Sequence, residues 1–225
     1  MPSDQQETER KLRAPLGQRK IDEAEELVTP YLAAEATPPA SKKLIEAEMA
    51  YAKKEYERAR DLTASSLQLR GDSIVALNLL GKTLMCLSEF EGALKCFEKA
   101  QDLSPKNVER LCAIAEAQTE VGEEAAAEDA MDDAQMLDPD ASSVADGQVK
   151  VALAKGDSEA AKEIMGHLDS LSGIVSYMNN KAVARAKCGQ VESAVEMYQK
   201  TIDSIPDDKE EIKAIADLPS REVLL

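Results

Sequence analysis

The 225-residue sequence has no tryptophan, a single histidine and too few basic residues to balance its acidic ones. Its 43 aspartates and glutamates against 27 lysines and arginines give a net charge of −16. A field of this sign repels the phosphate backbone of nucleic acids and the anionic surface of membranes. The composition therefore argues against nucleic-acid binding, and it favours a basic partner or simply high solubility.

Long apolar runs are also missing. No stretch approaches the ~20 apolar residues of a membrane-spanning helix, and the polar residues 1–15 lack the apolar core of a signal peptide. The four cysteines form no CxxC pair, and a chain of this length does not depend on disulfides for its stability. We therefore expect a soluble, cytoplasmic protein with free thiols and no membrane insertion.

Catalytic and metal-binding motifs are equally scarce. The lone His167 has no cysteine at ligand spacing, whereas a zinc site needs three or four convergent ligands. The run 138–149 has Ser143 where a calcium loop requires glycine. The sequence contains no glycine-rich phosphate loop and no GxSxG elbow. We therefore expect no enzymatic activity, no metal and no cofactor.

Helix-forming residues dominate, and an apolar content of 44% is enough for a continuous core. Their pattern repeats with a period near 34 residues. In residues 79–105, Leu80-Gly81 is followed by Ala93, Phe97, Ala100 and Pro105. The frame recurs at Glu46-Ala47 with Ala59; at Ile114-Ala115 with Ala127, Met131, Ala134 and Pro139; at Gln148-Val149 with Ala161 and Met165; and, after a step of 33, at Lys181-Ala182 with Ala194, Tyr198 and Pro206.

This pattern resembles the tetratricopeptide repeat, whose marks are small residues at positions eight, twenty and twenty-seven and a proline at position thirty-two. The resemblance implies an all-α fold, a right-handed α-solenoid of stacked antiparallel helix pairs that form a superhelix. A chance helical bundle would not keep the turn residues in register. The expected organisation is a degenerate N-terminal repeat or cap at 1–39, repeats at 40–73, 74–107, 108–141, 142–174 and 175–208, and a solvating helix or the start of a further repeat at 209–225.

Glycine and proline mark the expected ends of the helices. Gly122, Gly156 and Gly189 stand where a first helix must stop and reverse, because glycine tolerates a positive φ. Lys54 and Ser88 occupy the same place in two other repeats. Prolines 105, 139 and 206 end second helices, since the residue before a proline is pushed out of helical geometry. Proline 15 is expected to interrupt a first helix in the N-terminal segment.

A finer resemblance covers residues 99–111, 151–157 and 176–202. These segments are similar to the repeat region of bacterial proteins that carry a phosphoacceptor receiver domain ahead of tetratricopeptide repeats. No receiver domain is present in this sequence. The resemblance implies an adaptor in intracellular signalling.

Such repeats line the inner surface of the array with their first helices. In the family, positions two, five, nine, twelve and thirteen of a first helix usually face this groove. The resemblance places the following residues there: Leu44, Glu48, Tyr51, Asn78, Lys82, Met85, Cys112, Glu116, Thr119, Asp146, Lys150, Leu153, Asn179, Val183 and Lys187. Their mixture of polar and apolar side chains suits a docked peptide or helix. We therefore predict a protein-interaction adaptor or scaffold in bacterial signalling or assembly that binds another protein or a peptide; the alternative is a self-associating structural protein, and the oligomeric state stays open.

Three narrower hypotheses accompany the groove. Asn179 and Asn180, at the expected start of a first helix, hold a peptide backbone or satisfy their own helix start. The acidic run on the second helix at 124–133 is a docking patch for a basic partner or a solvated convex face. The carboxylate clamp that grips chaperone tails is not met, because Ala113 and Ser143 replace its next asparagine and lysine.

Overall fold

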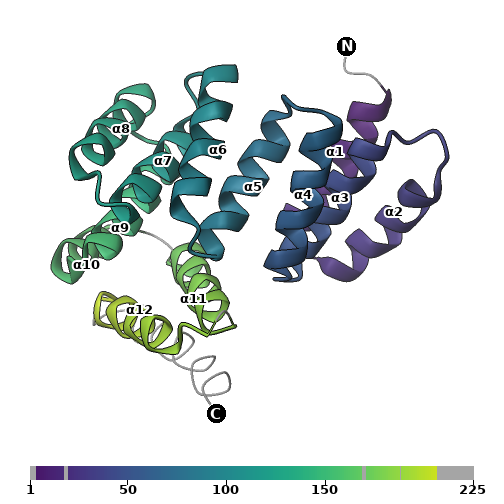
Figure 1. The fold of residues 1–225 in the computed structure, drawn as a ribbon. Helices are drawn as coiled ribbons and strands as arrows, with labels where there is room; N and C mark the ends of the chain where they lie inside the picture. Colours follow the sequence, from purple (N-terminus) through teal and green to yellow (C-terminus); the bar gives the residue numbers. More distant parts are fainter. Residues whose placement is uncertain (1–3, 18–19, 169–170, 188, 207–225) are drawn as a thin grey trace. The chain divides into compact units, whose positions relative to one another are not determined.

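The computed structural model describes residues 4–17, 20–168, 171–187 and 189–206 (Figure 1). Over these residues the chain is all-α, with no strand, as predicted. The helices are α1 (Asp4–Gly17), α2 (Ile21–Ala33), α3 (Pro39–Ala52), α4 (Tyr56–Leu69), α5 (Ile74–Cys86), α6 (Phe90–Leu103), α7 (Val108–Glu120), α8 (Glu124–Leu137), α9 (Ser142–Lys155), α10 (Ser158–Gly166), α11 (Ser172–Lys187) and α12 (Val191–Asp203).

The helices follow the expected pairs, two to each predicted repeat. Helix α11 begins at Ser172, three residues before the boundary expected at 175. The predicted segment 209–225 lies outside the described residues. The chain divides into two compact units, residues 1–83 (unit 1) and 84–225 (unit 2), so the division falls inside α5. Each unit is described below by itself.

The turn between the two helices of a pair recurs with the same backbone conformation. Lys54, Ser88, Gly122, Gly156 and Gly189 all have φ between 62° and 85°. At Gly122 the amide donates to the Thr119 carbonyl (3.1 Å) and the next amide donates to the Gln118 carbonyl (2.8 Å). Equivalent bonds form at the other four positions. These bonds satisfy the carbonyls at the end of the first helix, and the glycine prediction is confirmed.

Small residues mark where the helices of the array approach closely. The alanine at the same frame position is fully buried in every repeat: Ala59, Ala93, Ala127, Ala161 and Ala194. In α9 the close approach is made by Gly147, because a Cβ placed there would lie 2.8 Å from the Cβ of Cys112 on α7. The frame expected the small residue at Val149, and the structure has it two positions earlier, at Gly147.

The prolines divide into two groups. Helices α6 and α8 end two residues before Pro105 and Pro139, as predicted. The expectation that Pro15 interrupts a first helix was wrong, because α1 runs through it to Gly17. Pro15 lacks the N–H that would donate to the carbonyl four residues earlier, so α1 loses one hydrogen bond there but continues for two more residues. The Pro15 carbonyl accepts a hydrogen bond from the Lys20 amide (2.9 Å).

The core of unit 1 joins helices α1, α2, α3 and α5 through apolar side chains. Ala24, Val28 and Tyr31 of α2 pack with Ile45 and Met49 of α3. A second cluster joins α3 to the first turns of α5 through Leu44, Ala47, Ala76 and Leu79. At the edge of this core, Arg13 of α1 donates to the half-buried Glu48 of α3 (2.7 Å). This ion pair links the first helices of consecutive repeats.

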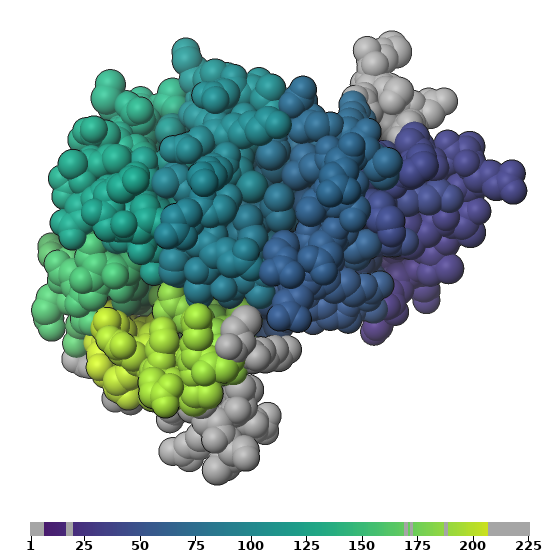
Figure 2. Space-filling view, viewed as in Figure 1, coloured from purple at the N-terminus to yellow at the C-terminus, as the bar shows by residue number. Residues whose placement is uncertain are grey.

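In unit 2 the last helix pair departs from regular stacking. Helix α10 has nine residues, whereas α4, α6 and α8 have fourteen. Helix α10 is therefore shorter than the other second helices by more than one turn. Helix α11 then contacts α7, two repeats back, as well as the start of α6, as the hydrogen bonds and ring contacts below show. In Figure 2 the green surface of α11 adjoins the teal surface of α6, and the Lys181 ammonium of α11 lies over the Phe90 ring of α6.

Candidate partner-binding site

The fifteen predicted groove residues differ widely in accessibility. Six are buried: Leu44, Met85, Cys112, Glu116, Leu153 and Val183. Seven are half-buried: Glu48, Tyr51, Asn78, Thr119, Asp146, Lys150 and Asn179. Lys82 is exposed, and the side chain of Lys187 lies outside the described residues. The first-helix face is therefore partly closed rather than open along its whole length.

A buried ion network closes this face at α7. The Lys181 ammonium of α11 donates to Glu116 (2.8 Å) and to Glu120 (2.7 Å), both on α7. The Lys181 side chain is 1% exposed, and those of Glu116 and Glu120 are 5% and 14% exposed. The hydroxyl of Tyr177 donates a further hydrogen bond to Glu116 (2.9 Å). Helix α11 is thus fixed to α7 by charged groups that are almost entirely removed from water.

Burial and pairing act in opposite directions on these charges. Burial alone would raise the pKa of Glu116. The charges of Lys181 and Lys150 and the hydrogen bonds from Lys181 and Tyr177 together lower it by more than burial raises it, so the pKa is lowered overall. For Lys181, burial lowers the pKa, yet the two glutamates raise it more. Both groups therefore carry their charge at neutral pH, and the network is an ion pair rather than a neutral hydrogen bond.

Arg185, one turn further along α11, extends the network to other helices. Its Nε donates to the Ser88 hydroxyl (3.1 Å), and one terminal nitrogen donates to the Ser193 hydroxyl (3.3 Å). Its other nitrogen lies 3.5 Å from Glu120. The ring of Phe90 lies 5.4 Å from the Lys181 ammonium and 5.7 Å from the Arg185 guanidinium. Both cations are therefore held in fixed positions.

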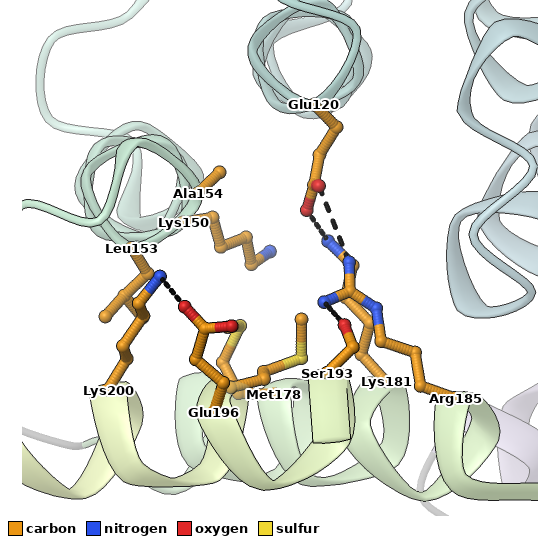
Figure 3. Close-up of a pocket in the computed structure, with 11 residues that line it drawn as sticks. Glu120, Lys150, Leu153, Ala154, Met178, Lys181, Arg185, Ser193, Glu196 and Lys200 are labelled. Atoms are coloured by element: carbon orange, nitrogen blue, oxygen red, sulfur yellow. Dashed lines mark hydrogen bonds and ion pairs between the residues drawn. The ribbon is translucent and has the colours of Figure 1, made fainter. Parts of the chain in front are cut away.

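Next to this network is a pocket of about 80 Å³ between α7, α9, α11 and α12 (Figure 3). Its lining consists of Glu120, Lys150, Leu153, Ala154, Met178, Lys181, Arg185, Ser193, Glu196, Met197 and Lys200. Lys200 and Glu196 form an ion pair (2.8 Å) at the solvent side, where the Glu196 side chain is 66% exposed. Two of the predicted groove residues, Lys150 and Leu153, thus meet in one pocket.

Lys150 differs from the other cations of the pocket. Its ammonium lies 4.5 Å from the centre of the Tyr177 ring, a cation–π contact. Figure 3 shows its side chain extending into the pocket, and no dashed line ends on it. Among the described residues, no carboxylate forms an ion pair with this ammonium. Lys150 therefore offers hydrogen-bond donors to the space of the pocket.

Comparison with known proteins identifies the fold of this chain. The model of the tetratricopeptide repeat matches residues 74–107. The chain has the tetratricopeptide-repeat fold. It is similar in structure to a tetratricopeptide repeat protein from Parabacteroides merdae ATCC 43184 (TM-score 0.55, 15% identity, 97% of this chain and 91% of that chain). The comparison with curated proteins found no match.

Two further solved structures share the fold. The type IV pilus biogenesis factor PilW has a TM-score of 0.60 at 13% identity, and the match covers 100% of both chains. The thermophilic tetratricopeptide-repeat protein TTC0263 from Thermus thermophilus has a TM-score of 0.53 at 18% identity, covering 83% of this chain and 100% of that one. At these identities the likeness establishes the tetratricopeptide-repeat fold alone.

Sequence analysis missed most of the ion network. Lys181 occupies the frame position at which the other repeats of this chain carry Glu46, Leu80, Ile114 and Gln148. Because polar and apolar residues both occur at this position, the lysine by itself gave no sign of a buried ion network. Its carboxylate partners could not be found from the sequence, because regular stacking would bring α11 to α9 rather than to α7.

The asparagine pair also lies elsewhere than predicted. Helix α11 begins at Ser172, so Asn179 and Asn180 are in the middle of the helix and not at its start. The side-chain oxygen of Asn179 accepts a hydrogen bond from the Tyr198 hydroxyl (2.7 Å), which ties α11 to α12. This oxygen of Asn179 is thus engaged within the repeat itself.

The Cys112 thiol and the His167 imidazole do not line the pocket. Burial raises the pKa of the Cys112 thiol to about 11, so this cysteine is a poor nucleophile at neutral pH. His167 is exposed and follows the last residue of α10. Within the part of the chain that the structure describes, no three histidine, cysteine, aspartate or glutamate side chains are grouped to hold a metal. The described helices include none with the length and apolarity needed to cross a membrane.

Proposed function

We propose that this protein is an interaction scaffold that holds a partner polypeptide on the accessible part of its first-helix face. One observation carries the proposal: Lys150 and Leu153, which the repeat frame assigns to the groove, both line the pocket of unit 2. A pocket of mixed polar and apolar lining on a helical-repeat surface suits a polypeptide ligand.

The burial of α7 narrows the surface that a partner can use. Within unit 2, Glu116 and Cys112 are covered, whereas Thr119, Asp146 and Lys150 keep accessible surface. The partner therefore contacts the polar residues that the core leaves outside. This set differs from an apolar groove of the kind that accepts an amphipathic helix along its full length.

The setting that we propose is the cytoplasm of a bacterium, in intracellular signalling or assembly. It rests on the similarity of residues 99–111, 151–157 and 176–202 to repeat regions linked to receiver domains. The net charge of −16 supports a protein partner rather than a nucleic acid.

Affinity capture from a lysate of the source organism tests the scaffold function. The bait is the parent protein, beside a groove variant with Lys82→Glu and Lys150→Glu. A matched control carries Lys95→Glu on α6 and Lys155→Glu on α9, so both variants have the same change in net charge. A partner retained by the parent and the control but lost by the groove variant supports the proposal. A partner captured equally by all three proteins refutes binding on the first-helix face.

A second candidate, self-association, is favoured by apolar side chains exposed near the ends of second helices. Met136 of α8 is 83% exposed, and Leu103 and Leu137 occupy equivalent exposed positions on α6 and α8. Sedimentation velocity over a hundredfold concentration range tests it with the variant Met136→Lys, Leu137→Lys. A mass that rises with concentration in the parent and not in the variant supports this candidate, and a constant parent mass eliminates it.

A further inference from the structure

We propose that the pocket between α7, α9, α11 and α12 is a binding site for a carboxylate group carried by the partner polypeptide. This inference rests on the proposed scaffold function and names the chemistry by which the partner is recognised. Lys150 is the residue that binds the carboxylate directly, and Arg185 and Lys200 shape the field around it.

The local charge is opposite to that of the whole protein. Four cations line the pocket, against the two lining carboxylates of Glu120 and Glu196 and the buried Glu116 behind them. The pocket is therefore a positive region in a chain whose net charge is −16. The protein as a whole repels an anion, whereas the cations of the pocket attract one locally.

The existing ion pairs leave one cation available. Glu116 and Glu120 are occupied by Lys181, with Arg185 close to Glu120. Lys200 is paired with the exposed Glu196, a contact between residues one turn apart that contributes little stability. The Lys150 ammonium has three N–H donors, and its contact with the Tyr177 ring uses none of them in a hydrogen bond to an oxygen.

The size and lining of the pocket fit a carboxylate on a short apolar stem. A volume of about 80 Å³ exceeds the ~10–15 Å³ that a cavity needs to hold one water molecule, so the pocket has room for a carboxylate group. The side chains of Met178 and Met197, with Leu153, supply apolar surface for the methylene groups of the ligand. The remaining donors of Lys150 then meet the two carboxylate oxygens.

The same charges disfavour a phosphate group. Glu196 at the solvent side repels a dianion more strongly than a monoanion, and Lys200 neutralises it only in part. The excess of positive charge over negative in the network is a single unit, because Lys150, Lys181, Arg185 and Lys200 face three glutamates. A monoanionic carboxylate matches this excess.

The test is a titration of the protein labelled with ¹³C at its methionine methyl groups, followed by NMR. Met178 and Met197 report on the pocket, and the exposed Met136 reports on nonspecific binding. Three blocked peptides serve as probes: N-acetyl-Ala-Glu-Ala amide presents a side-chain carboxylate, N-acetyl-Ala-Ala-Ala with a free C-terminus presents a chain-end carboxylate, and N-acetyl-Ala-Gln-Ala amide presents neither. Inorganic phosphate is the fourth probe.

We expect saturable shifts of Met178 and Met197, without a shift of Met136, on addition of at least one carboxylate peptide. The two carboxylate peptides show whether the group comes from a side chain or from a chain end. Lys150→Gln weakens this binding by about tenfold, as expected for the loss of a charged hydrogen-bond donor. The separate variant Lys150→Arg retains the binding of the carboxylate peptide. Lys155→Gln, on the same helix but outside the pocket, leaves this binding unchanged.

The proposal is refuted if the glutamine peptide shifts the two pocket methyls as strongly as both carboxylate peptides, or if phosphate binds more tightly than either. It is also refuted if neither carboxylate peptide shifts them, or if Lys150→Gln binds within twofold of the parent. Circular dichroism of each variant confirms that the helices are retained. A negative titration beside a capture that depends on Lys82 and Lys150 leaves the scaffold function standing and removes only the carboxylate assignment.

Discussion

Replacing Lys181 by methionine should destabilise unit 2 strongly, because it removes the cation and keeps a side chain of similar length. Lys181 is 1% exposed and makes two ion pairs, at 2.8 Å and 2.7 Å. Lys181→Met leaves the Glu116 carboxylate buried, with only the Tyr177 hydroxyl as a direct hydrogen-bond donor. Breaking a buried ion pair by removing one partner costs about 3–5 kcal/mol of unfolding free energy. Glu120 is partly exposed and regains water, so we expect a value near the lower end.

Urea denaturation followed by circular dichroism measures this loss, and hydrogen exchange of α11 amides shows whether the last helix pair opens first. The matched control is Lys155→Met, which breaks an exposed pair with Glu128 in the same unit. This control should change the unfolding free energy by less than about 1 kcal/mol. The double variant Lys181→Met, Glu116→Gln should recover part of the loss, since no uncompensated charge stays buried. A loss below about 1 kcal/mol for Lys181→Met would refute the reasoning.

The same pair predicts a pH dependence at both ends of the range. The pKa of Glu116 is lowered from 4.5, so its contribution is present above that pH and is lost as the pH falls toward the folded pKa. The pKa of Lys181 is raised from 10.5, so its contribution is present below that pH and is lost as the pH rises through the folded pKa. The stability difference between the parent and Lys181→Met should therefore be largest near neutral pH. A difference that stays constant down to pH 3 would contradict this account.

Three further substitutions test the packing and the turns by urea denaturation. Gly147→Ala should lower the unfolding free energy by about 1–3 kcal/mol, despite the better helix propensity of alanine, because its Cβ would lie 2.8 Å from the Cβ of Cys112; an unchanged stability would mean that α9 shifts freely. Ala127→Leu, at a fully buried position, should cost about 1–3 kcal/mol, and a variant that unfolds like the parent would contradict the repeat frame. Lys54→Gly should raise stability by about 0.5–1 kcal/mol, since Lys54 has φ of 63°, whereas a loss would show that the lysine side chain stabilises the turn.

The repeat period determined the helix pairs, because close helix packing demands small residues and turns with a positive φ favour glycine. Ala93 and Ala127 had to be small since a neighbouring helix lies against them, and both are fully buried. Gly122 and Gly156 had to tolerate a positive φ, and they have it. Pro15 was misjudged because a proline inside a helix removes one hydrogen bond to the preceding turn without always ending the helix, and the sequence alone does not show whether the rest of the helix persists.

The repeat frame predicted only part of the candidate site. Lys150 and Leu153 were placed on the groove by their position in the frame, whereas Lys200 and Arg185 were not predicted. The reason is that a repeat frame describes contacts between neighbouring repeats, and the pocket is built across repeats by the early end of α10 at Gly166.

By itself, the sequence thus determined the all-α class, the pairing of helices and the places of the turns, because these depend on interactions within about 34 residues. Only the tertiary structure decided which part of the first-helix face is closed. That decision depends on Lys181 meeting Glu116 and Glu120 across more than sixty residues of chain. Burying a lysine is unfavourable unless carboxylates are already in place to receive it, and their arrangement exists only in the folded unit.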